Sequence, residues 1–195
     1  MTVLLSMAAF ALASSITPGP VNVVALSAGA HHGLAASLRH VTGATVGFTL
    51  LLLLIGLGLH EMLARFPDLI EIVKWAGVGF LLYMAYKLAI DNGQLGADKP
   101  ARGPSFAHGA AMQWLNPKAW LASLAGMGAY AAGGDGRLVW QFTALYFVIC
   151  YLSIASWAYA GTFLRRHLRE AKRVRVFNRV MAALLALSAV YLLVE

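Results

Sequence analysis

Long apolar runs without a single charge dominate this sequence. Residues 1–30 contain no charged side chain, and neither do residues 41–59 or 138–164. An α-helix needs roughly 20 apolar residues to cross the hydrocarbon core of a bilayer. Inside lipid the backbone must satisfy its own hydrogen bonds, so an open chain can cross only as helices. The runs therefore predict an all-α integral membrane protein.

The composition leaves little chain for anything else. Of the 195 residues, 60% are hydrophobic and 12% are charged, whereas soluble domains are near half apolar and a quarter charged. About six transmembrane helices with short loops use nearly all of it. We expect these spans at about 3–28, 38–60, 69–90, 105–130, 138–164 and 175–194.

The charge pattern predicts an orientation. The formal net charge is +7, which in a soluble protein would suggest nucleic acid as a partner. Here the basic residues gather in loops between apolar runs, as in cytoplasmic loops of membrane proteins, so the bilayer is expected and nucleic acid is not. The most basic loop follows residues 138–164 and holds Arg165, Arg166, Arg169, Lys172, Arg173 and Arg175. Counting back through alternate loops places both termini on the non-cytoplasmic side.

Two of the expected spans carry helix-breaking motifs near their middle. The first contains residues 17–20, TPGP, and the fourth contains residues 116–118, NPK. Proline inside a helix removes a backbone donor and clashes with the preceding turn. Asn before Pro is how a helix begins, and Thr17 before Pro18 is interpreted in the same way. Each span is therefore predicted to be two half-helices, the second newly capped at mid-membrane.

The two motifs occupy matching places in the two halves of the chain. Pro20 and Pro117 are 97 positions apart, about half the length. With three spans in each half, the halves would insert upside-down to one another. Paired interruptions in inverted halves point to the binding site of a transporter. We expect one transmembrane domain, 1–195, with repeat 1 at about 1–92, a linker at about 93–102 and repeat 2 at about 103–195.

The chemistry of such a site follows from the half-helices. A helix N-terminus carries about half a positive charge and unpaired N–H donors, and Lys118 adds a full charge beside the second one. An ammonium at mid-bilayer should face a cavity or a partner. The arrangement suits a carboxylate or another anionic group. The candidate substrate-binding residues are Thr17, Pro18, Gly19, Pro20, Asn22, Asn116, Pro117 and Lys118.

These motifs resemble a known family. The TPGP motif is followed by Gly33, Gly43 and Gly47, then by VKWAG at 73–77 and LLYMAYK at 81–87. In the second half FAHG at 106–109 leads to NPKA at 116–119. The whole chain is similar to the lysine exporter (LysE) and homoserine–threonine efflux (RhtB) superfamily. The resemblance implies a multi-pass protein of the bacterial inner membrane that exports an amino acid by proton exchange. It also implies that the candidate residues frame the substrate path.

Weaker patterns leave alternatives open. Gly43 and Gly47 form a small-xxx-small motif, which favours close helix packing within the chain over a homodimer interface.

The six histidines lack nearby acidic or thiol ligands at metal spacing, so neither a metal nor another cofactor is expected. His108 is the better candidate for a group that titrates, since the expected spans hold no deep Asp or Glu. No nucleotide-binding motif is present, so ATP is not expected to drive transport within this chain.

Three other functions remain as alternatives to amino-acid export. Transport of a metal cation would require carboxylates inside the membrane. An integral membrane enzyme would require a nucleophile and a base at matched depth, and His108 and Ser123 are roughly four turns apart on one expected helix. A membrane scaffold would not need two breaks and a lysine at the midplane. The sequence therefore predicts a transporter and not an enzyme.

Overall fold

The computed structural model describes residues 3–59, 67–92, 103–131, 135–167 and 170–194, and all regular structure in these ranges is helical. The helices are α1 (Val3–Ile16), α2 (Pro20–His32), α3 (Leu34–Leu54), α5 (Pro67–Ala89), α6 (Phe106–Trp114), α7 (Pro117–Tyr130), α8 (Gly136–His167) and α9 (Ala171–Val194). A short π-helical segment, η1 (Ile55–Leu59), continues α3. The six segments predicted as spans are all helical, and the first and fourth are broken where expected.

Two helices of the described part are long and apolar enough to cross a bilayer. These stretches are Leu34–Gly58 and Gly136–Leu164, and the bent pair α1–α2 meets the same criterion as a third. Their outward faces are apolar, with Leu152 of α8 exposed over 63% of its surface. An apolar outer surface of this kind is what a lipid-facing helix presents.

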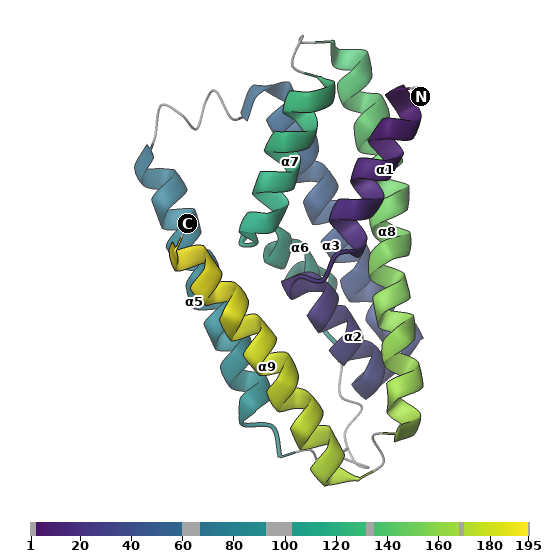
Figure 1. Cartoon of the computed structure of the whole chain (residues 1–195), viewed down its shortest axis with the longest axis vertical. Coiled ribbons are helices and arrows are strands. Elements are labelled where there is room, and N and C mark those ends of the chain that lie inside the picture. The colour runs from purple at the N-terminus through teal and green to yellow at the C-terminus, as the bar shows by residue number, and fades with distance from the viewer. Residues whose placement is uncertain (1–2, 60–66, 93–102, 132–134, 168–169, 195) are drawn as a thin grey trace.

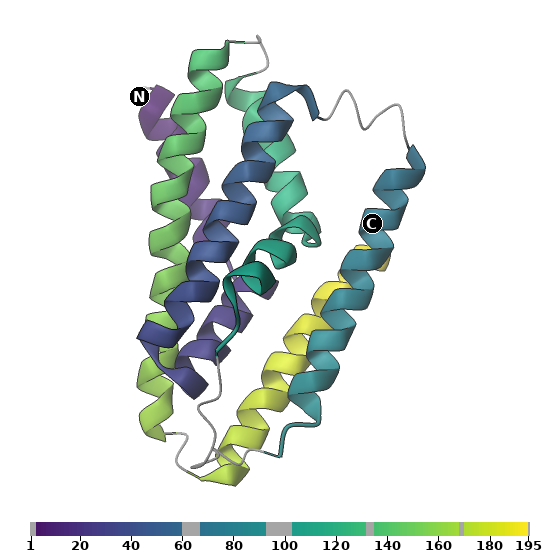
Figure 2. The same cartoon turned by 180° about the vertical axis from the view of Figure 1, so that it is seen from behind.

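The helices pack across the two halves of the sequence. α1 and α2 lie along α8, α6 lies along α3, and α5 lies along α9. Both views show the α5–α9 pair inclined away from the other helices (Figures 1 and 2). α2 and α7 begin near the middle of the long axis and run toward opposite ends (Figure 1). The breaks therefore meet in the interior of the bundle.

Glycines set the closest of these contacts. A Cβ atom at Gly43 of α3 would overlap the carbonyl oxygen of Phe106, and one at Gly47 would lie 2.7 Å from the Cα of Ala110. On the other side, a Cβ at Gly29 of α2 would overlap the carbonyl oxygen of Ala158 in α8. Small residues let helix backbones approach this closely. The prediction that Gly43 and Gly47 serve packing within the chain is confirmed.

Basic side chains gather at one end of the bundle. α2, α5 and α8 end there and α3 and α9 begin there, at the lower end in Figure 1. Arg39 lies in the second turn of α3, Lys87 in the last turn of α5, and Lys172 and Arg173 in the first turn of α9. We call this the basic end.

Candidate functional site

The first break separates α1 from α2 and bends the pair by 61°. α2 begins at Pro20, and Gly19 precedes it with extended backbone and no side-chain cap. Proline fits the first helical position because the missing N–H would have no helical partner there. The interpretation of Thr17 as cap and Pro18 as first residue is therefore wrong. The Thr17 hydroxyl instead donates to the carbonyl of Ala13 and prolongs the end of α1.

The second break separates α6 from α7 and begins as predicted. Pro117 is the first residue of α7, and the side-chain oxygen of Asn116 accepts the N–H of Lys118 at 3.2 Å. The indole N–H of Trp120 donates to the carbonyl of Trp114 at 2.8 Å, which ties the new helix to the end of α6. Two polar bonds thus hold the turn between the half-helices.

The break in α1 frees carbonyl groups that three other elements satisfy. The last carbonyls of a helix have no intrahelical donor and carry partial negative charge. The Ser15 carbonyl accepts from the Asn22 side chain of α2 at 2.9 Å, and the Ile16 carbonyl accepts from the Trp157 indole of α8 at 3.1 Å. Side chains from separate helices thus fix the open backbone.

Lys118 supplies the remaining donor from α7. Its ammonium donates to the carbonyl of Thr17 at 2.6 Å and to that of Pro18 at 3.4 Å. A cation is favoured at a helix C-terminus because the dipole is negative there. The partner that an ammonium at this depth requires is therefore backbone of the opposite break.

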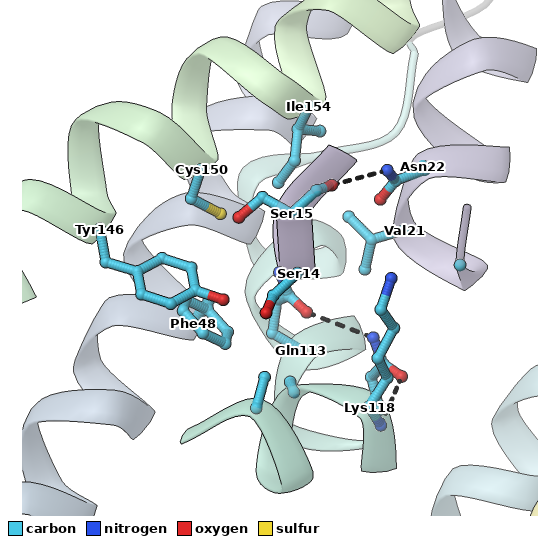
Figure 3. A pocket seen from close by; sticks show the side chains of 14 residues that line it. Ser14, Ser15, Val21, Asn22, Phe48, Gln113, Lys118, Tyr146, Cys150 and Ile154 are labelled. Carbon is cyan, nitrogen blue, oxygen red and sulfur yellow. Dashed lines mark hydrogen bonds between the residues drawn. The ribbon is translucent and has the colours of Figure 1, made fainter. Parts of the chain in front are cut away.

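A small cavity of about 40 Å³ lies between the two breaks. Figure 3 shows Lys118 and Asn22 on one side, with Tyr146 and Cys150 of α8 on the other. The Tyr146 hydroxyl points toward Ser14, and the Cys150 thiol points toward the Ser15 hydroxyl (Figure 3). A cationic group, amides, hydroxyls and a thiol therefore surround one space.

The structure brings the eight predicted site residues together with different roles. Gly19, Asn22, Asn116 and Lys118 line the cavity. Thr17 and Pro18 contribute the carbonyls that Lys118 contacts, while Pro20 and Pro117 start the two half-helices. The expectation that α2 and α7 run in opposite directions from a shared centre is confirmed (Figure 1).

Other residues that line the cavity were not predicted from the sequence, because no motif marks them as binding residues. Tyr146, Cys150 and Ile154 lie in an uncharged run, and their spacing of four residues places them on one face of α8. That spacing identifies a face but not its partner. Gln113 of α6, three residues before Asn116, accepts from its side-chain amide at 3.4 Å. In the described part no three His, Cys, Asp or Glu side chains come together as metal ligands.

The sequence is similar to those of known proteins over most of its length. The chain is 29% identical over 185 residues to a cysteine/O-acetylserine efflux protein of Salmonella typhimurium (strain LT2), covering 93% of this chain and 92% of the relative. The protein of that description from Escherichia coli (strain K12) is 29% identical over 184 residues, and the one from Shigella flexneri serotype 5b is 30% identical over 184 residues, with the same shares covered. No solved structure matches.

A family model carries the assignment over almost the whole chain. The model described as LysE type translocator matches residues 12–195 and so includes both breaks. The resemblance seen in the TPGP and NPK motifs is therefore confirmed. The chain belongs to the LysE type translocator family, a family of multi-pass membrane transport proteins and not of enzymes.

Proposed function

We propose that the protein is a secondary transporter that exports an amino acid or similar small zwitterion from the cytoplasm by proton antiport with alternating access. Its relatives are named as cysteine/O-acetylserine efflux proteins. Those substrates are small, polar and neutral overall, so we propose a substrate of the same class. The cavity lining of hydroxyls, amides and a thiol fits that class.

The observation that carries the proposal is the contact of Lys118 with the Thr17 and Pro18 carbonyls. A zwitterion can replace this contact completely. Its carboxylate takes the place of the carbonyls on the Lys118 ammonium, and its own ammonium takes the place of Lys118 on the carbonyls. A cation alone would face the Lys118 ammonium without compensation. An anion alone would leave the Pro18 carbonyl without the ammonium that it contacts, and the Thr17 carbonyl would keep only the Asn22 side-chain amide at 3.4 Å.

The size of the cavity indicates that the site must open. Its volume of about 40 Å³ holds only a few water molecules, since each water needs about 10–15 Å³ on the same measure. An amino acid is several times larger. We propose that substrate entry separates the two breaks and that release on the other side lets Lys118 return to the carbonyls.

A six-span topology accounts for the remaining helices. α1–α2, α3 and α5 form the first set, and α6–α7, α8 and α9 form the inverted second set, corresponding to repeats at about 1–92 and 103–195. α5 and α9 contain 23 and 24 residues, and helices of that length reach about 35 Å, enough to cross a bilayer. We assign the basic end to the cytoplasm because of its excess of Lys and Arg, and we propose that both termini lie on the non-cytoplasmic side of the bacterial inner membrane.

Transport by the purified protein in proteoliposomes tests the proposal. We expect labelled cysteine to move against an imposed pH gradient, toward the more acidic side from which protons leave. Two matched analogues test the need for a zwitterion: cysteamine lacks the carboxylate and 3-mercaptopropionate lacks the ammonium. We expect neither analogue to be carried. Transport of cysteamine at the rate of cysteine would refute the zwitterion site.

A further inference from the structure

Two imidazoles lie together away from the candidate substrate site. The ring centroids of His40 on α3 and His108 on α6 are 5.6 Å apart. His40 is completely buried, and within the described part of the chain neither of its ring nitrogens has a hydrogen-bond partner. Nδ1 of His108 also has none there. Buried polar atoms of this kind are normally bonded, so this pair calls for an explanation.

The helix packing fixes the pair. A Cβ atom at Gly109, next to His108, would overlap the carbonyl oxygen of His40, so the two backbones touch at this point. The ring of Phe80 from α5 lies 5.5 Å from the His108 ring and closes a further side. The two imidazoles therefore lie beside a close backbone approach of α3 and α6.

The pair lies between a surface cavity and the central cavity. His108 is half-buried and lines a surface cavity of about 750 Å³ at the basic end, together with His32, Lys87 and Asp91. Along the helices, Gln113 follows His108 by five residues and Phe48 follows His40 by eight, and both line the central cavity. At 1.5 Å per residue these separations are about 8 and 12 Å.

The charged surroundings are sparse. Lys87 and Asp91 come from the end of α5, His32 from α2, and Arg39 precedes His40 in α3. The other large partner of α3 is α8, which carries no Asp, Glu, Lys, Arg or His between residues 138 and 164. No carboxylate of the sequence lies within α3 or α6. Beyond the surface cavity, α3 and α6 thus offer a proton imidazole but no carboxylate.

We infer that His40 and His108 form the proton-carrying site of this transporter. The inference rests on the proposed antiport. Imidazole gains and loses a proton near neutral pH, and two imidazoles this close bind at most one proton at a time, because a second positive charge would be repelled. The pair carries that proton inward while substrate leaves, and His108 releases it to the surface cavity at the basic end. One proton bound and one released balance the step.

Proteoliposomes containing His108→Gln or His40→Gln separate coupling from substrate binding. We expect both variants to keep exchange of labelled for unlabelled cysteine at equal pH, which needs no net proton movement. We expect them to lose uptake driven by a pH gradient, and to lose the proton flux that the dye pyranine reports when substrate is added. The matched control is His31→Gln, because the His31 Nδ1 donates to the carbonyl of Ser27 at 2.8 Å in its own helix. It should retain all three activities.

Each other result counts against the inference. Gradient-driven uptake that survives in both variants would overturn the proton site while leaving antiport intact. Loss of equal-pH exchange in His108→Gln would also overturn it, since the half-buried ring would then serve structure or substrate. A wild-type protein that exchanges cysteine but ignores the gradient would overturn antiport itself, and the proton site with it.

Discussion

The ammonium nitrogen of Lys118 lies 2.6 Å from the carbonyl oxygen of Thr17, although the two residues are 101 positions apart in the sequence. The bond joins the start of α7 to the end of α1. Hydrogen bonds to charged groups contribute about 1.5–3 kcal/mol. One side chain thus holds the two helix breaks together.

Removal of this side chain should stop transport without removing the protein. For Lys118→Ala we expect export to fall at least about 100-fold, since the carboxylate partner and the link between the breaks are lost together. Measurement of cysteine export from cells, with the amount of protein in the membrane as reference, checks this. Lys172→Ala, which removes an exposed basic residue of α9, is the control. Full export from Lys118→Ala would refute the proposed carboxylate site.

A methyl group at Gly19 should disturb the same bond indirectly. A Cβ at this position would lie 3.2 Å from Cδ and 3.3 Å from Nζ of Lys118. Overpacking of this degree costs about 1–3 kcal/mol, so we expect Gly19→Ala to lower the cysteine transport rate about tenfold. Gly128→Ala on α7, where a Cβ would meet nothing within 4 Å, is the matched control. Equal rates in the two variants would contradict the prediction.

The chain also contains its own reporter of the cavity. Cys150 is its single cysteine, lines the cavity and is 3% exposed. We expect N-ethylmaleimide to label it slowly in the wild type and about tenfold faster in Lys118→Ala, because loss of the link costs the closed arrangement more than about 1.4 kcal/mol. Saturating O-acetylserine, which unlike cysteine has no thiol to consume the reagent, should slow labelling, and mass spectrometry measures the rate. Identical rates with and without Lys118 would show that the bond does not keep the cavity closed.

The glycine contact between α3 and α6 should govern stability. Gly43→Ala places a Cβ against the carbonyl of Phe106, and we expect it to lower the free energy of unfolding by about 1–3 kcal/mol. Gly79→Ala in α5 meets nothing within 4 Å, so helix propensity should make it neutral or stabilising by up to about 1 kcal/mol. Thermal unfolding in detergent compares the two variants. Equal melting temperatures would mean that α3 and α6 can move apart to accept the added methyl group without a loss of stability.

The proposed topology makes a simple prediction for the C-terminus. A reporter enzyme fused after Glu195 should show non-cytoplasmic activity, because an even number of spans follows a non-cytoplasmic N-terminus. A second fusion after Lys172, in the first turn of α9, should show cytoplasmic activity. A cytoplasmic signal from the first fusion would overturn the six-span arrangement.

The sequence predicted those features that depend on local chemistry. Uncharged runs located the helices, and Asn116 before Pro117 located the start of α7, because a cap and a fixed proline backbone act within a few residues. The same local reasoning gave the wrong helix start at Thr17 and Pro18. The pattern there permits a cap, but the proline pair placed the helix start at Pro20 and left the Thr17 hydroxyl to bond within α1.

Contacts between residues far apart in the chain could not be predicted from the sequence pattern in this way. Lys118 was predicted to need a partner, yet nothing near it in the chain names the carbonyl of Thr17. Trp157 donates to Ile16 across 141 positions, and its surroundings in the uncharged run look like those of any interfacial tryptophan. His40 and His108 meet only because α3 and α6 cross at Gly43 and Gly109. Such pairings depend on which helix faces which, a property of the assembled bundle.

The packing of each half against the other has a consequence for how such chains can be recombined. The most extensive helix contacts, α2 with α8, α3 with α6, α5 with α9, α3 with α8 and α1 with α8, all join residues before 92 to residues after 103. The two halves of the sequence are thus not separate structural units. A chimaera joining the first half of this chain to the second half of a relative must preserve the fit of Gly43 to residue 106 and of Gly29 to residue 158, or neither half will find a surface on which to fold.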